Sequence, residues 1–118
     1  MAEALISLNG RRFNVASTAA SGVVGPETIF NFGQDGSFVS AEYAGGRIRR
    51  GYLVGVLEDA KLTFRYCQIQ LDGRLDGGVS ECSVETLPDG RVRIIEAFEW
   101  ASRPGETGVN VFEELAPA

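Results

Sequence analysis

The sequence predicts an all-β fold, in which an antiparallel up-and-down meander of about eight strands closes into a small barrel. Turn-forming clusters of Gly, Asp and Pro recur at short, regular intervals along the 118 residues, a spacing typical of all-β domains. The runs between these clusters are rich in β-branched and aromatic residues, which favour strands. Helical periodicity is weak throughout, so we expect no helix longer than a single turn.

The first strand is expected at residues 11–17, directly after the turn-like Asn9-Gly10, with residues 5–8 as a candidate partner. The small, polar residues 16–25 predict a loop before the next strand. The seven later strands are expected at 27–33, 37–43, 47–57, 61–70, 79–87, 91–100 and 107–115. The turn signals that separate them lie at 34–36, 44–46, 58–60, 71–78, 88–90 and 103–105.

Hairpin register assigns the side chains to two faces of the sheet. When each turn is centred on its middle residue, even-numbered residues share one face, because opposite residues in a hairpin have a constant sum. The predicted pairs include Phe32 with Phe38, Tyr52 with Phe38 and Tyr66, and Cys82 with Glu96. The even face is mostly apolar. The odd face carries many charges and is expected to face water, with Glu85 opposite Arg93.

An apolar sheet face without a helix to cover it must cover itself. The sheet can do so as a sandwich or as a barrel, and consecutive short hairpins favour the up-and-down barrel. The lumen of an eight-stranded barrel is either just filled by side chains or just wide enough for one small ligand. The sequence therefore predicts that any binding site lies in the lumen.

Polar residues form one layer across this apolar face. The layer consists of Ser40, Arg50, Gln68, Cys82 and Glu96, with Glu42, Tyr52, Tyr66 and Ser80 beside it. Burying an unpaired guanidinium or carboxylate is costly, so Arg50 and Glu96 should pair with each other, contact water or meet a polar ligand group. Two interpretations follow: a self-satisfied network that fixes the register, or the polar end of a binding pocket.

Composition excludes several function classes. The 16 acidic and 11 basic side chains give a net charge of -5, which argues against a nucleic-acid partner. The absence of histidine excludes histidine triads and histidine-ligated zinc. No transmembrane run and no leader segment are recognisable, so we expect a cytoplasmic protein without membrane contact. Cys67 and Cys82 fall on opposite faces and match no metal motif, so we expect neither a disulfide nor a metal site.

Four segments carry a resemblance to a known family. They are residues 41–55 (AEYAGGRIRRGYLVG), Tyr66 with Gln68, residues 73–80, and residues 96–100 (EAFEW). Over residues 12–114 the chain resembles a family of small bacterial proteins that are similar to avidin-like barrels, many of which carry the label N-acetylglutamate synthase. The resemblance implies an avidin- or lipocalin-like barrel. It carries over Tyr43, Gly45, Gly46, Gly51, Gly55, Tyr66, Gln68, Glu96 and Trp100, while Phe98 stands where many members have tryptophan.

We favour a non-catalytic function for this barrel. A single domain spanning residues 1–118 is expected to bind one small apolar or amphipathic molecule in an aromatic lumen that contains a polar layer. The candidate ligand-binding residues are Arg50, Tyr52, Tyr66, Gln68, Cys82, Glu96, Phe98 and Trp100.

Two alternatives stay open. The first is a small enzyme, as the synthase label implies, with Arg50 as an electrostatic stabiliser and acid–base candidates Glu42, Tyr52, Tyr66, Cys82 and Glu96. No glycine-rich loop leads into a helix that could hold a coenzyme A pyrophosphate, so we expect no cofactor. The second is an interaction module with a solid barrel, in which an apolar outer patch favours a homo-oligomer such as a homodimer. The candidate patch residues are Leu53, Ile69 and Ile95.

Overall fold

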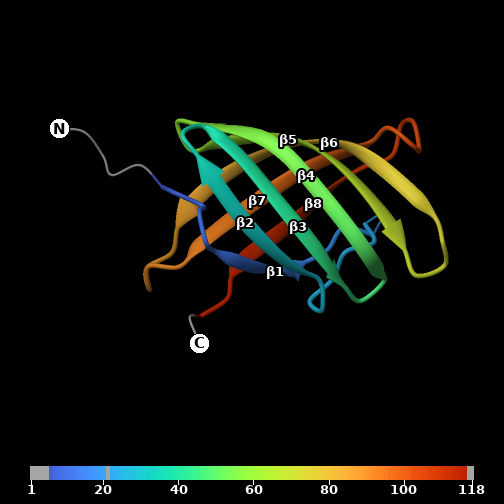
Figure 1. Ribbon diagram of the computed structural model, residues 1–118, viewed down its shortest axis with the longest axis horizontal. Helices are drawn as coiled ribbons and strands as arrows, with labels where there is room; N and C mark the ends of the chain where they lie inside the picture. The colour runs from blue at the N-terminus through green and yellow to red at the C-terminus, as the bar shows by residue number, and fades with distance from the viewer. Residues whose placement is uncertain (1–5, 21, 117–118) are drawn as a thin grey trace.

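The computed structural model describes residues 6–20 and 22–116, and these form an all-β barrel. Eight antiparallel strands follow one another in sequence order, and the barrel closes where β1 pairs with β8 (Figure 1). The strands are β1 (Arg12–Ser17), β2 (Ile29–Asp35), β3 (Phe38–Gly45), β4 (Ile48–Glu58), β5 (Lys61–Gln70), β6 (Leu75–Thr86), β7 (Val92–Trp100) and β8 (Thr107–Glu114). The predicted fold class is confirmed. None of the described residues belongs to a helix that could cross a membrane.

The two ends of the barrel differ in their connections. One end, here called the short-turn end, carries the connections 36–37, 59–60 and 87–91, whereas the long-loop end carries 18–28, 46–47, 71–74 and 101–106. Figure 1 shows the short turns on the left and loops 71–74 and 101–106 on the right. Leu8 is fully buried outside any strand, and residue 5 of the predicted partner segment 5–8 lies outside the described residues.

The predicted register is wrong at three hairpins. In the β3–β4 hairpin Phe38 pairs with Val56 instead of the predicted Tyr52, which shifts the pairing but leaves its parity unchanged. In the β2–β3 hairpin Asp35 pairs with Phe38, and in the β4–β5 hairpin Glu58 pairs with Lys61, so each turn contains two residues rather than three. Gly36, Asp59 and Ala60 have positive φ angles, which two-residue hairpin turns require to match the strand twist. Because a one-residue slip moves every side chain to the other face, β3, and β4 from Gly51 onward, point their odd-numbered residues into the barrel, whereas before the irregularity at residues 48–50 Ile48 is the buried residue.

This slip changes the position of several predicted lumen residues. The predictions that Arg50 and Tyr52 line the lumen are wrong: Tyr52 is 54% exposed, and Arg50 forms an ion pair with the exposed Glu42 on the outer face. Phe38, Val54 and Val56 also lie outside, against prediction. Leu53, predicted for the outer patch, is instead buried inside the barrel.

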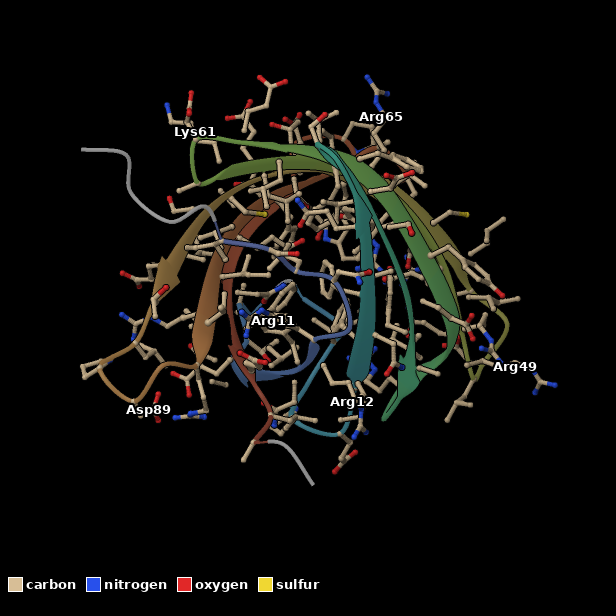
Figure 2. The ribbon with its side chains drawn as sticks, turned by 60° about the vertical axis from the view of Figure 1, so that its left-hand side comes forward. Arg11, Arg12, Arg49, Lys61, Arg65 and Asp89 are labelled. Atoms are coloured by element: carbon tan, nitrogen blue, oxygen red, sulfur yellow. The ribbon has the colours of Figure 1, made fainter. Side chains whose placement is uncertain are left out.

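The register predicted for the β6–β7 hairpin is confirmed. Across β6 and β7, Cys82 pairs with Glu96 and Glu85 with Arg93. The Arg93 guanidinium and the Glu85 carboxylate lie 2.7 Å apart as an ion pair on the outer face. Figure 2 shows the side chains of Arg49, Lys61 and Arg65 pointing away from the barrel. Cys82 is buried and Cys67 is exposed.

Strand β6 begins at Leu75, four residues before the start that the sequence predicts. The segment 72–78 contains three glycines and therefore has the composition of a loop. In the barrel, however, Gly78 lies so close to its neighbours that a Cβ atom there would be 2.6 Å from the Tyr66 hydroxyl and 2.2 Å from the Glu99 carbonyl oxygen. The glycine allows Tyr66 to pack across the strand.

The interior is apolar towards the short-turn end and combines aromatic with polar side chains towards the long-loop end. The apolar part includes Phe13, Leu57, Leu62, Val84 and Val92, all buried near the short turns. The buried polar side chains are Thr28, Gln68, Gln70, Asp76, Ser80, Glu96 and Asn110. They lie in the middle of the barrel and at its long-loop end, so this end is where a polar ligand group could be recognised.

Candidate functional site

A cleft opens into the barrel from the long-loop end. Its walls are mainly aromatic and include Phe30, Tyr43, Tyr66, Phe98 and Trp100. The cleft measures about 340 Å³ when the space open to solvent is included, but its inner part is narrow. As it stands, the inner part of the cleft has room for about one water molecule.

The aromatic walls are held by contacts between rings. Phe30 stacks on Tyr43 with ring centroids 4.3 Å apart. On the opposite wall, Trp100 makes edge-to-face contacts with Tyr66 at 5.7 Å and with Phe98 at 5.6 Å. Such contacts add to the stability gained from burial, so the walls are fixed by the barrel itself.

A tyrosine–glutamine pair lies in this wall. The Tyr43 hydroxyl of β3 donates a hydrogen bond of 2.7 Å to Oε1 of Gln68 on β5. Gln68 is 3% exposed, and its Nε2 atom has no hydrogen-bond partner among the described residues. Buried side-chain donors nearly always have a partner, and leaving one unpaired is costly. The cleft therefore presents an unused hydrogen-bond donor.

A buried carboxyl group lies beside this pair. Glu96 of β7 accepts hydrogen bonds from the Ser80 hydroxyl at 2.6 Å and from Nδ2 of Asn110 at 2.9 Å. It is 5% exposed. Burial raises the pKa of Glu96 above its usual range, although the two hydrogen bonds oppose this shift. No arginine or lysine among the described residues pairs with it.

The other titratable groups near Glu96 favour their neutral forms. Burial raises the pKa of Tyr43, Tyr66 and Cys82, and a negative charge on Glu96 raises each of them further. Because ionised groups are poorly solvated in a low-dielectric interior, their neutral forms are favoured. Among the described residues that line the cleft, none carries a positive charge that could balance a carboxylate at Glu96.

The β1–β2 connection covers the mouth of the cleft. Gly22, Val23 and Val24 line the cleft, and both valines are buried. Within the described residues 18–20 and 22–24, the Ala19 amide ties the segment to the strands by donating to Oδ1 of Asn110 at 3.0 Å. The Asn110 side chain therefore contacts both the covering segment and Glu96.

A second polar cluster fixes the β7–β8 loop at the same end. Asp76 accepts hydrogen bonds from Arg103 at 2.7 Å, from Ser102 at 2.9 Å and from Gln70 at 3.1 Å. Burial alone would raise the pKa of Asp76, but these hydrogen bonds outweigh it and lower the pKa. The Arg103 guanidinium also lies 4.6 Å from the centre of the Trp100 ring. This cluster is satisfied within the chain and positions Trp100.

The structure brings together most of the predicted lumen residues. Those that line the cleft are Tyr66, Gln68, Glu96, Phe98 and Trp100. Cys82 is buried opposite Glu96, whereas Arg50 and Tyr52 lie outside. Sequence reasoning missed Tyr43 and Asn110 as site residues. Tyr43 belongs to the family motif, but its odd number placed it on the outer face in the predicted register. Asn110 has an even number on the predicted last strand, so the same register could have placed it in the lumen.

The comparison with protein families agrees with this geometry. The model of a family described as avidin-like protein matches residues 6–115. The chain belongs to the avidin-like family. This membership supports a small-molecule-binding barrel. It does not bear on the synthase label. No curated protein and no solved structure matches the chain.

Proposed function

We propose that this protein is a non-catalytic binding protein that holds one small molecule, mostly apolar with a polar end, inside the long-loop end of its barrel. The observation that carries the proposal is the unpaired Nε2 donor of Gln68, buried in an aromatic wall. Pockets of this kind combine apolar walls with a few convergent polar groups. A ligand oxygen that accepts from Gln68 removes the energetic penalty of this donor.

Binding requires that the covering segment moves aside. The inner part of the cleft is too small for an organic ligand, but Val23 and Val24 occupy the mouth without belonging to any strand. When these two side chains leave, the aromatic walls stay in place because they belong to β2, β3, β5 and β7. The ligand then takes the place of the two valines between the aromatic walls of the cleft.

A thermal-shift screen against small metabolites tests the proposed function. A ligand at a hundred times its dissociation constant adds about 2.7 kcal/mol of stability, which raises Tm by several degrees in a domain of this size. We expect a hit whose effect is lost in Gln68→Met, which keeps the side-chain volume but removes the donor. Thr63→Val, a control on the outer face of the same strand, should retain the effect. The proposal is contradicted if no compound in the library raises Tm, or if a hit raises Tm equally in Gln68→Met.

The outer surface favours homo-oligomer formation as a second property. Phe38, Tyr52, Val54 and Val56, here called the β3–β4 strip, lie on neighbouring strands and are each about half exposed. Adjacent exposed apolar side chains commonly mark contact surfaces. We propose that two copies of the chain pair through this strip. Of the outer patch predicted from the sequence, Ile95 is exposed, Ile69 is half-buried and Leu53 is inside.

A further inference from the structure

The charge balance of the lumen indicates what kind of ligand it takes. Glu96 lies in the interior with two neutral donors, Ser80 and Asn110. The titratable groups that face it are Tyr43 on β3, Tyr66 on β5 and Cys82 on β6, and none of them can supply a positive charge. A carboxylate in such a place is stabilised strongly when a cation pairs with it, because the two neutral donors only partly offset the cost of burying its charge.

The walls around Glu96 also suit a cation. Phe30, Tyr43, Tyr66, Phe98 and Trp100 line the same cleft, and aromatic ring faces attract positive groups. The chain itself shows this pairing nearby, where the Arg103 guanidinium lies over Trp100 and bonds to Asp76. An aromatic ring and a carboxylate together therefore already hold one organic cation at this end of the barrel.

The unpaired Gln68 donor adds a second requirement. An ammonium group has no acceptor for an N–H, so it cannot satisfy Nε2 of Gln68. The complementary molecule must also carry an acceptor, such as a carbonyl or ether oxygen. Glu96 and Gln68 both line the cleft, so a single small molecule can contact both.

We propose that the lumen binds a small organic cation, a primary amine or amidine that also carries an oxygen acceptor, with the cation on Glu96 and the acceptor on Nε2 of Gln68. This inference rests on the proposed function and names the ligand class of the same site. Asn110 links ligand binding to access, because its amide bonds to both Glu96 and Ala19 of the covering segment.

Proton release accompanies binding in this scheme. Without a ligand, Glu96 is protonated over a wider pH range than an exposed glutamate, because burial disfavours its charged form. A bound ammonium stabilises the carboxylate, so the Glu96 proton leaves to the buffer while the amine keeps its own. Affinity should therefore rise with pH until Glu96 of the free protein is itself ionised.

Three probes of the same shape and different charge test the inference: 2-phenoxyethylamine, 2-phenoxyethanol and phenoxyacetate. Binding is followed by the fluorescence of Trp100, the single tryptophan of the chain, and by calorimetry in two buffers of different ionisation enthalpy. We expect the amine to bind at least about tenfold more tightly than the alcohol, the acid not to bind, and the amine to release protons.

Two variants locate the effect. Glu96→Gln keeps the side-chain shape and should weaken amine binding by at least about thirtyfold, the lower end of the loss when one partner of a buried charge pair is removed, while alcohol binding is unchanged. Glu81→Gln, an exposed position on β6, makes the same charge change and should alter neither. Circular dichroism and Trp100 fluorescence verify that Glu96→Gln is folded.

The outcomes distinguish failure of the cation inference from failure of the proposed function. If the alcohol binds as tightly as the amine, if Glu96→Gln leaves amine binding intact, or if none of the three probes binds, the cation inference is wrong. The proposed function still stands in these cases when the metabolite screen gives a neutral ligand that depends on Gln68. It fails only when that screen gives no ligand dependent on Gln68.

Discussion

Individual buried polar residues distinguish this barrel from one that is only a packed core. Asp76 has Arg103, Ser102 and Gln70 as partners, so its burial is explained within the chain. Gln68 retains an unpaired donor, and Glu96 has no cationic partner among the described residues. Unpaired buried groups lower stability, and they are commonly found where a protein meets its ligand.

Glu96→Gln should change how stability depends on pH. The folded pKa of Glu96 is raised, so its contribution to stability is fully present below the unfolded pKa of about 4.3 and is lost as pH rises through the folded pKa. The variant should match the wild type near pH 4 and become more stable than it towards pH 8. Each unit of raised pKa contributes about 1.4 kcal/mol.

Urea denaturation of both proteins at pH 4, 6 and 8 measures this difference. Asp76, whose pKa is lowered, loses its stabilising charge only at pH values below about 4, and it does so in both proteins. Glu81→Gln serves as the exposed control. A difference in unfolding free energy that is constant from pH 4 to pH 8 would contradict the account of Glu96.

Gly51→Ala should destabilise the barrel by about 1–3 kcal/mol, the usual cost of overpacking. A Cβ atom at this position would lie 2.3 Å from the Tyr43 ring, so the ring must move and strain its hydrogen bond to Gln68. Gly25→Ala is the matched control, because a Cβ atom there meets nothing within 4 Å. Urea denaturation gives the free energy of unfolding of both variants. Equal values would contradict the close packing of the Tyr43 ring against Gly51.

At the scale of strands, the seam between β1 and β2 is the least extensive in the barrel. The two strands pair only at Arg12 with Asn31 and at Phe13 with Phe30, and β1 has an irregular register against β8 between Val15 and Ser17. The covering segment 18–24 follows this seam directly. Segments with few backbone hydrogen bonds open most readily. We therefore expect the ligand to enter the lumen where the covering segment leaves this seam.

The β7–β8 loop should behave in the opposite way, as a fixed element. Arg103→Ala removes the partner of Asp76 and should cost about 2–3 kcal/mol, somewhat below the cost for fully buried pairs because Arg103 is partly exposed. Arg93→Ala breaks the more exposed pair with Glu85 and should cost about 1 kcal/mol or less. Urea denaturation compares the two, and equal losses would show that the loop is not held by this pair.

The sequence predicted strands well and register only in part. Strand positions follow from runs of β-formers between turn residues, and these runs are local. Register depends on how many residues of a cluster form the turn. Gln34-Asp35-Gly36 contains three turn-formers, yet the turn is formed by residues 36–37, and this one-residue difference moved Arg50 and Tyr52 from the lumen to the surface.

The same reasoning explains what was predicted of the site. The connection 87–91 is centred on residue 89, as predicted, so Glu96, Phe98 and Trp100 fell on the correct face. Tyr43 could not be placed, because its strand follows the first slip. The covering segment 18–24 carries no periodic pattern, so its position over the lumen depends on tertiary contacts alone.

At the scale of the whole molecule, the outer β3–β4 strip predicts the oligomeric state. We expect light scattering after size exclusion to give about twice the chain mass of 12.7 kDa. The double variant Val54→Thr/Val56→Thr keeps strand propensity and should shift the mass towards one chain. Val109→Thr, an equally exposed site on β8, is the control. A wild-type protein that is monomeric at high concentration would rule out the dimer.

The polarity of the barrel links the three scales. Its short-turn end is a packed apolar core, which gives stability, while its long-loop end collects the polar residues, the weak seam and the covering segment. A ligand site at the long-loop end therefore leaves the core undisturbed when the segment opens. The central claim is that this end, and not the outer surface, is where the small molecule binds.

Two-dimensional NMR of the labelled protein with the best ligand from the screen tests this claim most directly. We expect the largest shift changes at the side-chain amide of Gln68 and the indole N–H of Trp100, with further changes in residues 18–24. Changes confined to Tyr52, Val54 and Val56 on the outer strip, with the Gln68 and Trp100 signals unmoved, would contradict the lumen as the binding site.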